Sequence, residues 1–158
     1  MASAGAACDD LTLMRIRHGV DVEEVRNVAA LLAISDRARS RVFTEEEIRC
    51  CERAPDPARR FTGRFCAKEA LFKALGRGWQ GMGWTEAELG VDETDRPRFV
   101  LHGKLKARAE RLGVRSIDVS ISHTSHLAMA SVILVCASAD DGDGAVGRRD
   151  LIRDTRRS

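Results

Sequence analysis

The stretch GRFCAKEALFKALGRG, residues 63–78, places a single acid, Glu69, among four basic residues. Apolar residues recur around it at helical spacing and Gly76 supplies a stop, so the sequence predicts one long helix over residues 59–75. The apolar face of this helix consists of Phe61, Phe65, Phe72 and Leu75. Glu69 lies next to that face and is expected to be partly buried, where a carboxylate needs a partner or a metal ion. Lys73, four residues on, is one candidate partner, but such a pair contributes only about 0.2–0.5 kcal/mol to helix stability.

Residues 14–22, upstream of this helix, alternate between apolar and polar side chains, which predicts a strand. The apolar members of the alternation are Met14, Ile16, Val20 and Val22. Asp21 points to the opposite face at the end of this strand, so it could bring a second carboxylate to Glu69. The pattern becomes helical over residues 23–32. Another helix, expected over residues 44–53, begins at a capping box formed by Thr44 and Glu47.

The downstream part begins with a glycine-rich stretch and a second expected capping box, Thr85 to Glu88. The next expected elements are strands at residues 89–92 and 98–101 and a short basic helix at residues 104–112. The strongest strand signal comes last. SIDVSIS (116–122) alternates apolar and polar residues, and LAMASVILV (127–135) is an almost continuous apolar run, so the two form a hairpin with one well-buried strand.

This order of elements predicts a single α+β domain over residues 11–137, with an antiparallel sheet in its second half packed with the long helix. The first ten residues are small and polar, and we expect a flexible start there. Residues 138–158 carry dense charge of both signs and few apolar side chains, which predicts a disordered tail.

The amino-acid composition excludes few classes of function. The formal net charge of +2 is too small to indicate nucleic acid or a membrane as a partner. Its positive surplus lies in the body of the chain, which suits anionic ligands or an acidic partner. The five cysteines are an odd number without a CxxC pair, so we interpret them as reduced thiols in a cytoplasmic protein. The sequence contains no signal-peptide pattern and no apolar run near the ~20 residues of a membrane span.

Two carboxylates from separate elements, Asp21 and Glu69, suggest a magnesium site. Mg²⁺ takes one or two protein carboxylates and keeps its other positions for water and substrate phosphates. Arg64 and Lys68 share one side of the long helix, where they could hold further phosphate oxygens through charge-assisted hydrogen bonds. The glycine run after the helix could let the backbone approach a ligand closely, although it lacks the order of a P-loop and also fits a plain loop.

His123 and His126 flank the hairpin turn, and several interpretations of their role are possible. Both could simply be exposed residues of the turn. A metal site made by the pair lacks a third ligand nearby in sequence. A Ser122–His123 catalytic dyad is disfavoured because neighbours on a strand point to opposite faces. His123 as a phosphate ligand stays open.

Four segments, in this order and spacing, closely resemble a known enzyme family. They are GVDVEEV (19–25), RVFTEEE (41–47), GRFCAKEALFKALGRG (63–78) and SISHT (120–124). The resemblance is to the holo-acyl-carrier-protein synthases, the short trimeric type of 4′-phosphopantetheinyl transferase, and covers residues 13–136. It implies Mg²⁺-dependent transfer of the phosphopantetheine arm of coenzyme A to a serine of an apo acyl-carrier protein, releasing adenosine 3′,5′-bisphosphate.

The same resemblance implies roles for individual residues. Asp21 and Glu69 match the metal-binding acids, and Lys73 matches a lysine that stabilises charge on the reacting phosphates. Glu24 matches the second acid of a D-x-x-E motif. The serine proton would go to Glu69 or to water on the metal. The positions that match coenzyme contacts are Arg64, Lys68, Gly76, Gly78, His123 and Thr124.

The family fold implies a small α+β subunit in a homotrimer, with coenzyme clefts between neighbouring subunits. Family members meet the acidic surface of the carrier with basic residues on the first helix. The candidates here are Arg26, Arg37, Arg39 and Arg41. Three positions depart from the family pattern. Arg17 and His18 replace small or apolar residues, and Asn27 stands where many relatives carry an arginine that contacts the carrier. The carrier could belong to fatty-acid synthesis or to specialised polyketide or peptide synthesis. The altered first helix and the bulky loop GWQGMGW (78–84) suggest the specialised one.

A basic RNA-binding module without catalysis is the alternative function. Arginines and two tryptophans could contact phosphates and stack on bases. The basic residues do not interleave with aromatic ones, however, and no recognised RNA-binding motif is present. The sequence therefore favours the transferase, with coenzyme A as substrate.

Overall fold

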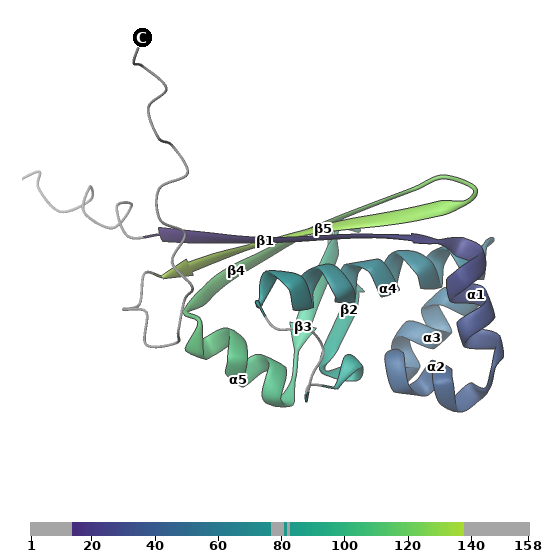
Figure 1. Ribbon diagram of the computed structural model, residues 1–158, viewed down its shortest axis with the longest axis horizontal. Coiled ribbons are helices and arrows are strands. Elements are labelled where there is room, and N and C mark those ends of the chain that lie inside the picture. The colour runs from purple at the N-terminus through teal and green to yellow at the C-terminus, as the bar shows by residue number, and fades with distance from the viewer. Residues whose placement is uncertain (1–13, 77–80, 82, 138–158) are drawn as a thin grey trace, which may run out of the picture.

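The computed structural model of the chain describes residues 14–76, 81 and 83–137. The expected flexible start and disordered tail lie outside these residues, as does Gly78. The fold is α+β: an antiparallel sheet packs against one long helix, with smaller helices at both ends of that helix (Figure 1). No helix of the described residues is both long and apolar enough to cross a bilayer.

The long helix α4 (Pro57–Ala74) is the centre of the fold and lies along one face of the sheet (Figure 1). It begins two residues earlier than the apolar pattern predicts. The side chain of Asp56 accepts a hydrogen bond from the Arg59 backbone N–H at 3.1 Å, and Pro57 occupies the first turn, where its missing N–H costs nothing. Gly76 follows the helix with φ of +77°, the left-handed conformation that closes many helices.

Three antiparallel strands form the main sheet, in the order β1-β5-β4. Their bounds are Met14–Glu24 for β1, Val114–His123 for β4 and Leu127–Ala137 for β5. Val132, in the middle of β5, pairs with Gly19 of β1 on one side and Val119 of β4 on the other. The apolar run of the predicted hairpin is therefore the central strand, hydrogen-bonded on both edges.

A second, two-stranded sheet pairs β2 (Ala87–Val91) with β3 (Pro97–Leu101), and helix α5 (Gly103–Arg111) follows it. The expected capping box of Thr85 and Glu88 is wrong. A single 3-10 turn, η2 (Trp84–Glu86), occupies this position without a side-chain cap, and the strand begins directly after it. Glu86 instead accepts a hydrogen bond from the Leu105 backbone N–H at 3.0 Å, which satisfies a donor in the first turn of α5.

Three short helices lie beside the amino-terminal half of α4 (Figure 1). They are α1 (Val25–Ala33), α2 (Asp36–Val42) and α3 (Glu45–Glu52). The predicted capping box of Thr44 and Glu47 opens α3. Helix α2 has no counterpart among the expected elements, because its sequence DRARSRV shows no apolar periodicity.

The two faces of strand β1 have opposite surroundings. Gly19 faces α4 so closely that a Cβ atom there would lie 2.0 Å from the carbonyl oxygen of Ala70. The alternating apolar side chains of β1 point the other way and stay exposed, as do their neighbours on β5. This outer face, defined by its exposed residues, consists of Met14, Ile16, Val20, Val22, Leu127, Met129 and Ile133. The hydrophobic core of the domain lies on the α4 side of the sheet.

Candidate active site

Asp21 reaches the surface of α4 because Gly19, two residues earlier on the same side of β1, lets the strand approach the helix. The Asp21 side chain is buried, with 9% of its surface exposed. Its Oδ1 accepts a hydrogen bond from Lys73 Nζ at 2.7 Å. Its Oδ2 is buried and has no hydrogen-bond partner in the described part of the chain. A buried carboxylate oxygen without a donor is costly, and a bound cation would satisfy it.

Glu69 lies one turn before Lys73 on α4 and is half-buried. Burial raises the pKa of Glu69 above its usual value, and the negative charge of nearby Asp21 raises it further. The two carboxylates thus come together from separate elements and repel each other, the arrangement that a divalent cation relieves. Among residues 14–76 and 83–137 no cluster of three potential metal ligands forms. Two carboxylates with open positions fit Mg²⁺ bound together with substrate phosphates.

Lys73 lies at the solvent-exposed edge of this site, with half of its side chain exposed. Its ammonium donates to Asp21 Oδ1 and to the Val20 carbonyl oxygen at 3.0 Å. The hydrogen bond to Asp21 is the main reason that the pKa of Lys73 is raised, so this lysine is charged at neutral pH. The sequence suggested Glu69 as its partner on the helix, but its ion pair in the described structure is with Asp21 on β1.

A pocket of about 350 Å³ opens at the amino-terminal end of α4. Its lining residues include Cys50, Arg53, Asp56, Arg59, Arg60 and His123. The exposed His123 at the end of β4 therefore joins three arginines that the sequence analysis did not select. Arg64 lies just behind Cys50: its Nη2 donates to Cys50 Sγ at 3.1 Å, and its buried Nε has no partner among the described residues. This concentration of positive charge suits a phosphate group.

The chain is similar to known proteins of one family. Residues 17–130 match the model of the 4′-phosphopantetheinyl transferase superfamily. A holo-acyl-carrier-protein synthase from Koribacter versatilis is 42% identical over 118 residues, which cover 73% of this chain and 94% of that protein. The chain belongs to the holo-acyl-carrier-protein synthases.

Solved structures of the family share its fold. The acyl carrier protein synthase of Plasmodium yoelii with ADP bound has a TM-score of 0.70 and 25% identity, covering 78% of this chain and 98% of that one. The complex of the Chronobacterium ammoniagenes synthase with CoA has a TM-score of 0.68 and 27% identity, covering 76% and 96%. The likeness therefore spans nearly the whole length of these relatives.

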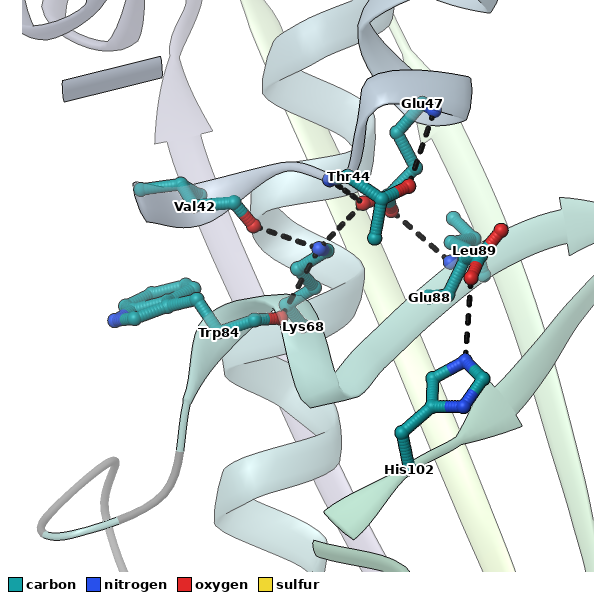
Figure 2. Close-up of polar contacts among 8 residues, drawn as sticks. All are labelled: Val42, Thr44, Glu47, Lys68, Trp84, Glu88, Leu89 and His102. Atoms are coloured by element: carbon teal, nitrogen blue, oxygen red, sulfur yellow. Dashed lines mark hydrogen bonds and ion pairs between the residues drawn. The ribbon is translucent and has the colours of Figure 1, made fainter. Parts of the chain in front are cut away.

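Lys68 lies elsewhere in this synthase than its predicted contact with the coenzyme requires. Its side chain is completely buried, and its ammonium bonds the Val42 and Trp84 carbonyl oxygens and the Glu47 carboxylate (Figure 2). Arg64 and Lys68 do share one side of α4, as the helical spacing predicted, but this side is buried and contacts Cys50 and Glu47 of α3. All three ammonium protons of Lys68 are used, so none is left for a phosphate.

The remaining predicted contacts lie on turns of the synthase fold. Gly76 is exposed just after α4. Thr124 is exposed in the β4–β5 turn, where its Oγ1 accepts hydrogen bonds from the backbone N–H groups of His126 and Leu127. Gly78 falls outside the described residues.

One acid near the site was missed. Glu24 pairs with Arg26, whereas the charge of Glu23 helps to raise the pKa of Glu69. The strand alternation could have found Glu23, which lies two residues after Asp21 and so on the same face of β1.

Proposed function

We propose that this synthase carries out the transfer with Asp21, Glu69 and Lys73 as its reacting centre. The enzyme transfers the 4′-phosphopantetheine group of coenzyme A to a serine of an apo acyl-carrier protein. One observation carries the assignment of the site: Asp21 presents one oxygen to Lys73 and leaves the other buried without a partner beside Glu69.

Asp21 and Glu69 are the residues that would hold Mg²⁺. The unpartnered Asp21 Oδ2 and the mutual repulsion of the two carboxylates support this choice. When bound, the ion would neutralise the diphosphate of coenzyme A and polarise its phosphoryl oxygens.

The reaction is an in-line phosphoryl transfer. The serine oxygen of the carrier forms a bond to the phosphorus next to the pantetheine arm, and the bond from this phosphorus to the bridging diphosphate oxygen breaks. Adenosine 3′,5′-bisphosphate leaves with that oxygen. The serine proton passes to Glu69 or to water beside it. The half-exposed ammonium of Lys73 offsets the charge that develops on the phosphates.

The basic pocket at the start of α4 would receive the 3′-phosphate end of the coenzyme. His123, Arg53, Arg59 and Arg60 line it, and Arg64 lies directly behind Cys50. Arg64 and His123 thus keep their predicted roles as coenzyme contacts in this proposal, with Gly76, Gly78 and Thr124 as backbone and turn contacts. Lys68 leaves the set, because its ammonium is buried and fully bonded.

A homotrimer is the assembly that we propose. The outer face carries seven exposed large apolar residues on two adjacent strands, a larger apolar area than isolated surface residues make. Packing this face against copies of itself around a threefold axis would bury it in a closed ring.

We propose that the natural carrier is an acidic acyl-carrier protein, either of fatty-acid synthesis or of a specialised polyketide or peptide synthesis. Arg37 and Arg41 are exposed on α2 and are available for it, whereas Arg26 on α1 pairs with Glu24, and Arg39 pairs with Asp36 and Glu52. The four described cysteines are all free thiols, which supports a reducing, cytoplasmic location for the enzyme and its carrier.

The test combines the protein, coenzyme A, Mg²⁺ and an apo carrier, and measures the mass of the carrier. We expect one phosphopantetheine arm to be added, and Asp21→Asn to prevent the addition. Faster turnover of a polyketide or peptide carrier than of a fatty-acid carrier supports the specialised role; equal or better turnover of the fatty-acid carrier refutes it. Salt-dependent RNA binding with no mass change on any carrier would favour the RNA-binding alternative.

A further inference from the structure

One ammonium group lies where three parts of the chain meet. Lys68 Nζ donates to the Val42 carbonyl oxygen at the end of α2 (2.7 Å), to Glu47 Oε2 on α3 (2.7 Å) and to the Trp84 carbonyl oxygen at the start of η2 (3.1 Å), as Figure 2 shows. The Lys68 and Glu47 side chains are 0% and 1% exposed. The pair is thus shielded from solvent, and neither side chain can touch a substrate.

Glu47 extends the connections of this pair (Figure 2). Its Oε2 also accepts the Thr44 backbone N–H at 2.9 Å, and its Oε1 accepts the Leu89 backbone N–H of β2 at 3.0 Å. The Trp84 indole, whose carbonyl bonds Lys68, stacks on Phe65 and meets the edge of Phe72 on α4. Helix α4 is therefore tied to α3, to β2 and to the turn that follows the glycine-rich segment.

A contribution to folding stability does not explain well why a buried ion pair occupies this position. Removing two charges from water costs several kcal/mol per ion, and well-packed apolar side chains often stabilise a core at least as well. An ion pair with several directed hydrogen bonds differs from apolar packing in one respect, because it fixes the relative orientation of the segments that carry its partners.

Two of the segments tied by this pair, α3 and α4, line the proposed coenzyme site. Helix α3 carries Cys50, which lines the basic pocket, and α4 carries Arg59 and Arg60 in the same lining. Glu69 follows Lys68 directly in the chain. The Trp84 turn ends the glycine-rich segment that begins at Gly76.

We propose that Glu47 and Lys68 are positioning residues that hold α3 and α4 in the arrangement that binds coenzyme A. This inference rests on the proposed coenzyme site and deepens it. The pair acts on the affinity for the coenzyme through the positions of Arg59, Arg60 and the pocket wall around Cys50, and leaves the reacting groups Asp21 and Lys73 in place.

The test removes both charges in the double variant Glu47→Gln/Lys68→Met of the full chain. Calorimetry measures the Kd for adenosine 3′,5′-bisphosphate, and steady-state kinetics measure KM for coenzyme A and kcat, all well below the Tm. We expect Kd and KM to rise about tenfold or more, because small misplacements of binding groups cost up to about a hundredfold. We expect kcat at saturating coenzyme to change by less than about threefold, since the reacting groups are unchanged.

Leu105→Ala is the matched control. Leu105 is fully buried on α5, outside the proposed site, and its truncation should lower the Tm by leaving a cavity. The double variant should also lower the Tm, because the Val42 and Trp84 carbonyl oxygens lose Lys68 as their hydrogen-bond donor. The control should keep the wild-type Kd and KM. A folded double variant with wild-type Kd and KM overturns the inference, as does an equal rise of Kd in Leu105→Ala.

If the double variant does not fold, the single variant Glu47→Gln tests the positioning role instead. Gln keeps an acceptor for Lys68 but removes the charge, so Kd should rise about threefold or more, and an unchanged Kd overturns the inference. Failure of the proposed coenzyme site gives a different result, because the wild-type protein itself would then not bind adenosine 3′,5′-bisphosphate.

Discussion

At the scale of single residues, the most informative atom is Oδ2 of Asp21. It is buried, lacks a hydrogen-bond donor in the described structure and lies beside a second carboxylate whose pKa is raised. The strand alternation correctly placed Asp21 opposite the apolar side chains of β1. Sequence alone could not show that Lys73 would choose Asp21 over Glu69, because that choice depends on how closely β1 approaches α4.

Asp21→Asn and Glu69→Gln should each weaken Mg²⁺ binding at least about tenfold and lower kcat about 100-fold or more, because each removes a negatively charged ligand of the metal that would neutralise the reacting phosphates. Titration of Mg²⁺ by calorimetry and turnover assays check both effects. Glu110→Gln is the control, since Glu110 is an exposed residue of α5 and has no role in the proposed site. Full activity of either site variant would mean that the metal site is misplaced.

The raised pKa of Glu69 predicts how Mg²⁺ binding depends on pH. Protons compete with the metal for this carboxylate. As the pH is lowered, Mg²⁺ affinity should therefore begin to fall while the pH is still above 4.5, the ordinary pKa of Glu. In the metal-free protein, the same shift means that the folded state binds this proton more tightly. The contribution of Glu69 to stability is therefore full below pH 4.5 and is lost as pH rises through the raised pKa.

Mg²⁺ titrations at a series of pH values test this. Glu69→Gln should weaken binding and remove the part of the pH dependence that comes from Glu69. An affinity that stays constant down to pH 4.5 in the wild-type protein would contradict the assignment.

At the scale of elements, the contact between β1 and α4 builds the site. Gly19→Ala places a Cβ atom 2.0 Å from the Ala70 carbonyl oxygen, so the strand must move away from the helix and take Asp21 with it. We expect a loss of about 1–3 kcal/mol in the free energy of unfolding, together with weaker Mg²⁺ binding. Urea denaturation measures the first effect. Gly90→Ala, with open space around its Cβ position, should change neither quantity.

The sequence predicted most elements and erred where tertiary contacts decide. The long helix, the capped helix α3 and the hairpin follow from periodicity and capping residues. Helix α2 was missed because it is largely polar, and the expected cap at Thr85 failed because Glu86 serves α5 instead. Lys68 was assigned to the wrong surroundings for a similar reason. Helical phase shows which residues share a side, but not whether a ligand or another helix covers that side.

At the scale of the whole molecule, the outer face determines the assembly that we propose. Ile16 on this face is 69% exposed. Ile16→Glu would place a charge in the buried contact between subunits, where it would lack a partner. We therefore expect a trimer for the wild-type chain and monomers for the variant in size-exclusion chromatography with light scattering. Val91→Glu, an exposed apolar position on β2, should remain trimeric. A monomeric wild type or a trimeric Ile16→Glu would refute the interface.

Arg17 places a positive charge at the carboxyl end of α4. Its Nε donates to the Ala74 carbonyl oxygen at 2.8 Å, and its guanidinium lies beside Gly76. The carboxyl end of a helix carries the negative pole of the helix dipole, equivalent to about half an elementary charge, which repels anions. A coenzyme phosphate brought to Gly76 would meet that repulsion. The positive charge of Arg17 offsets this repulsion, so under the proposed function an end of a helix that ordinarily disfavours phosphate would become one that the diphosphate could approach.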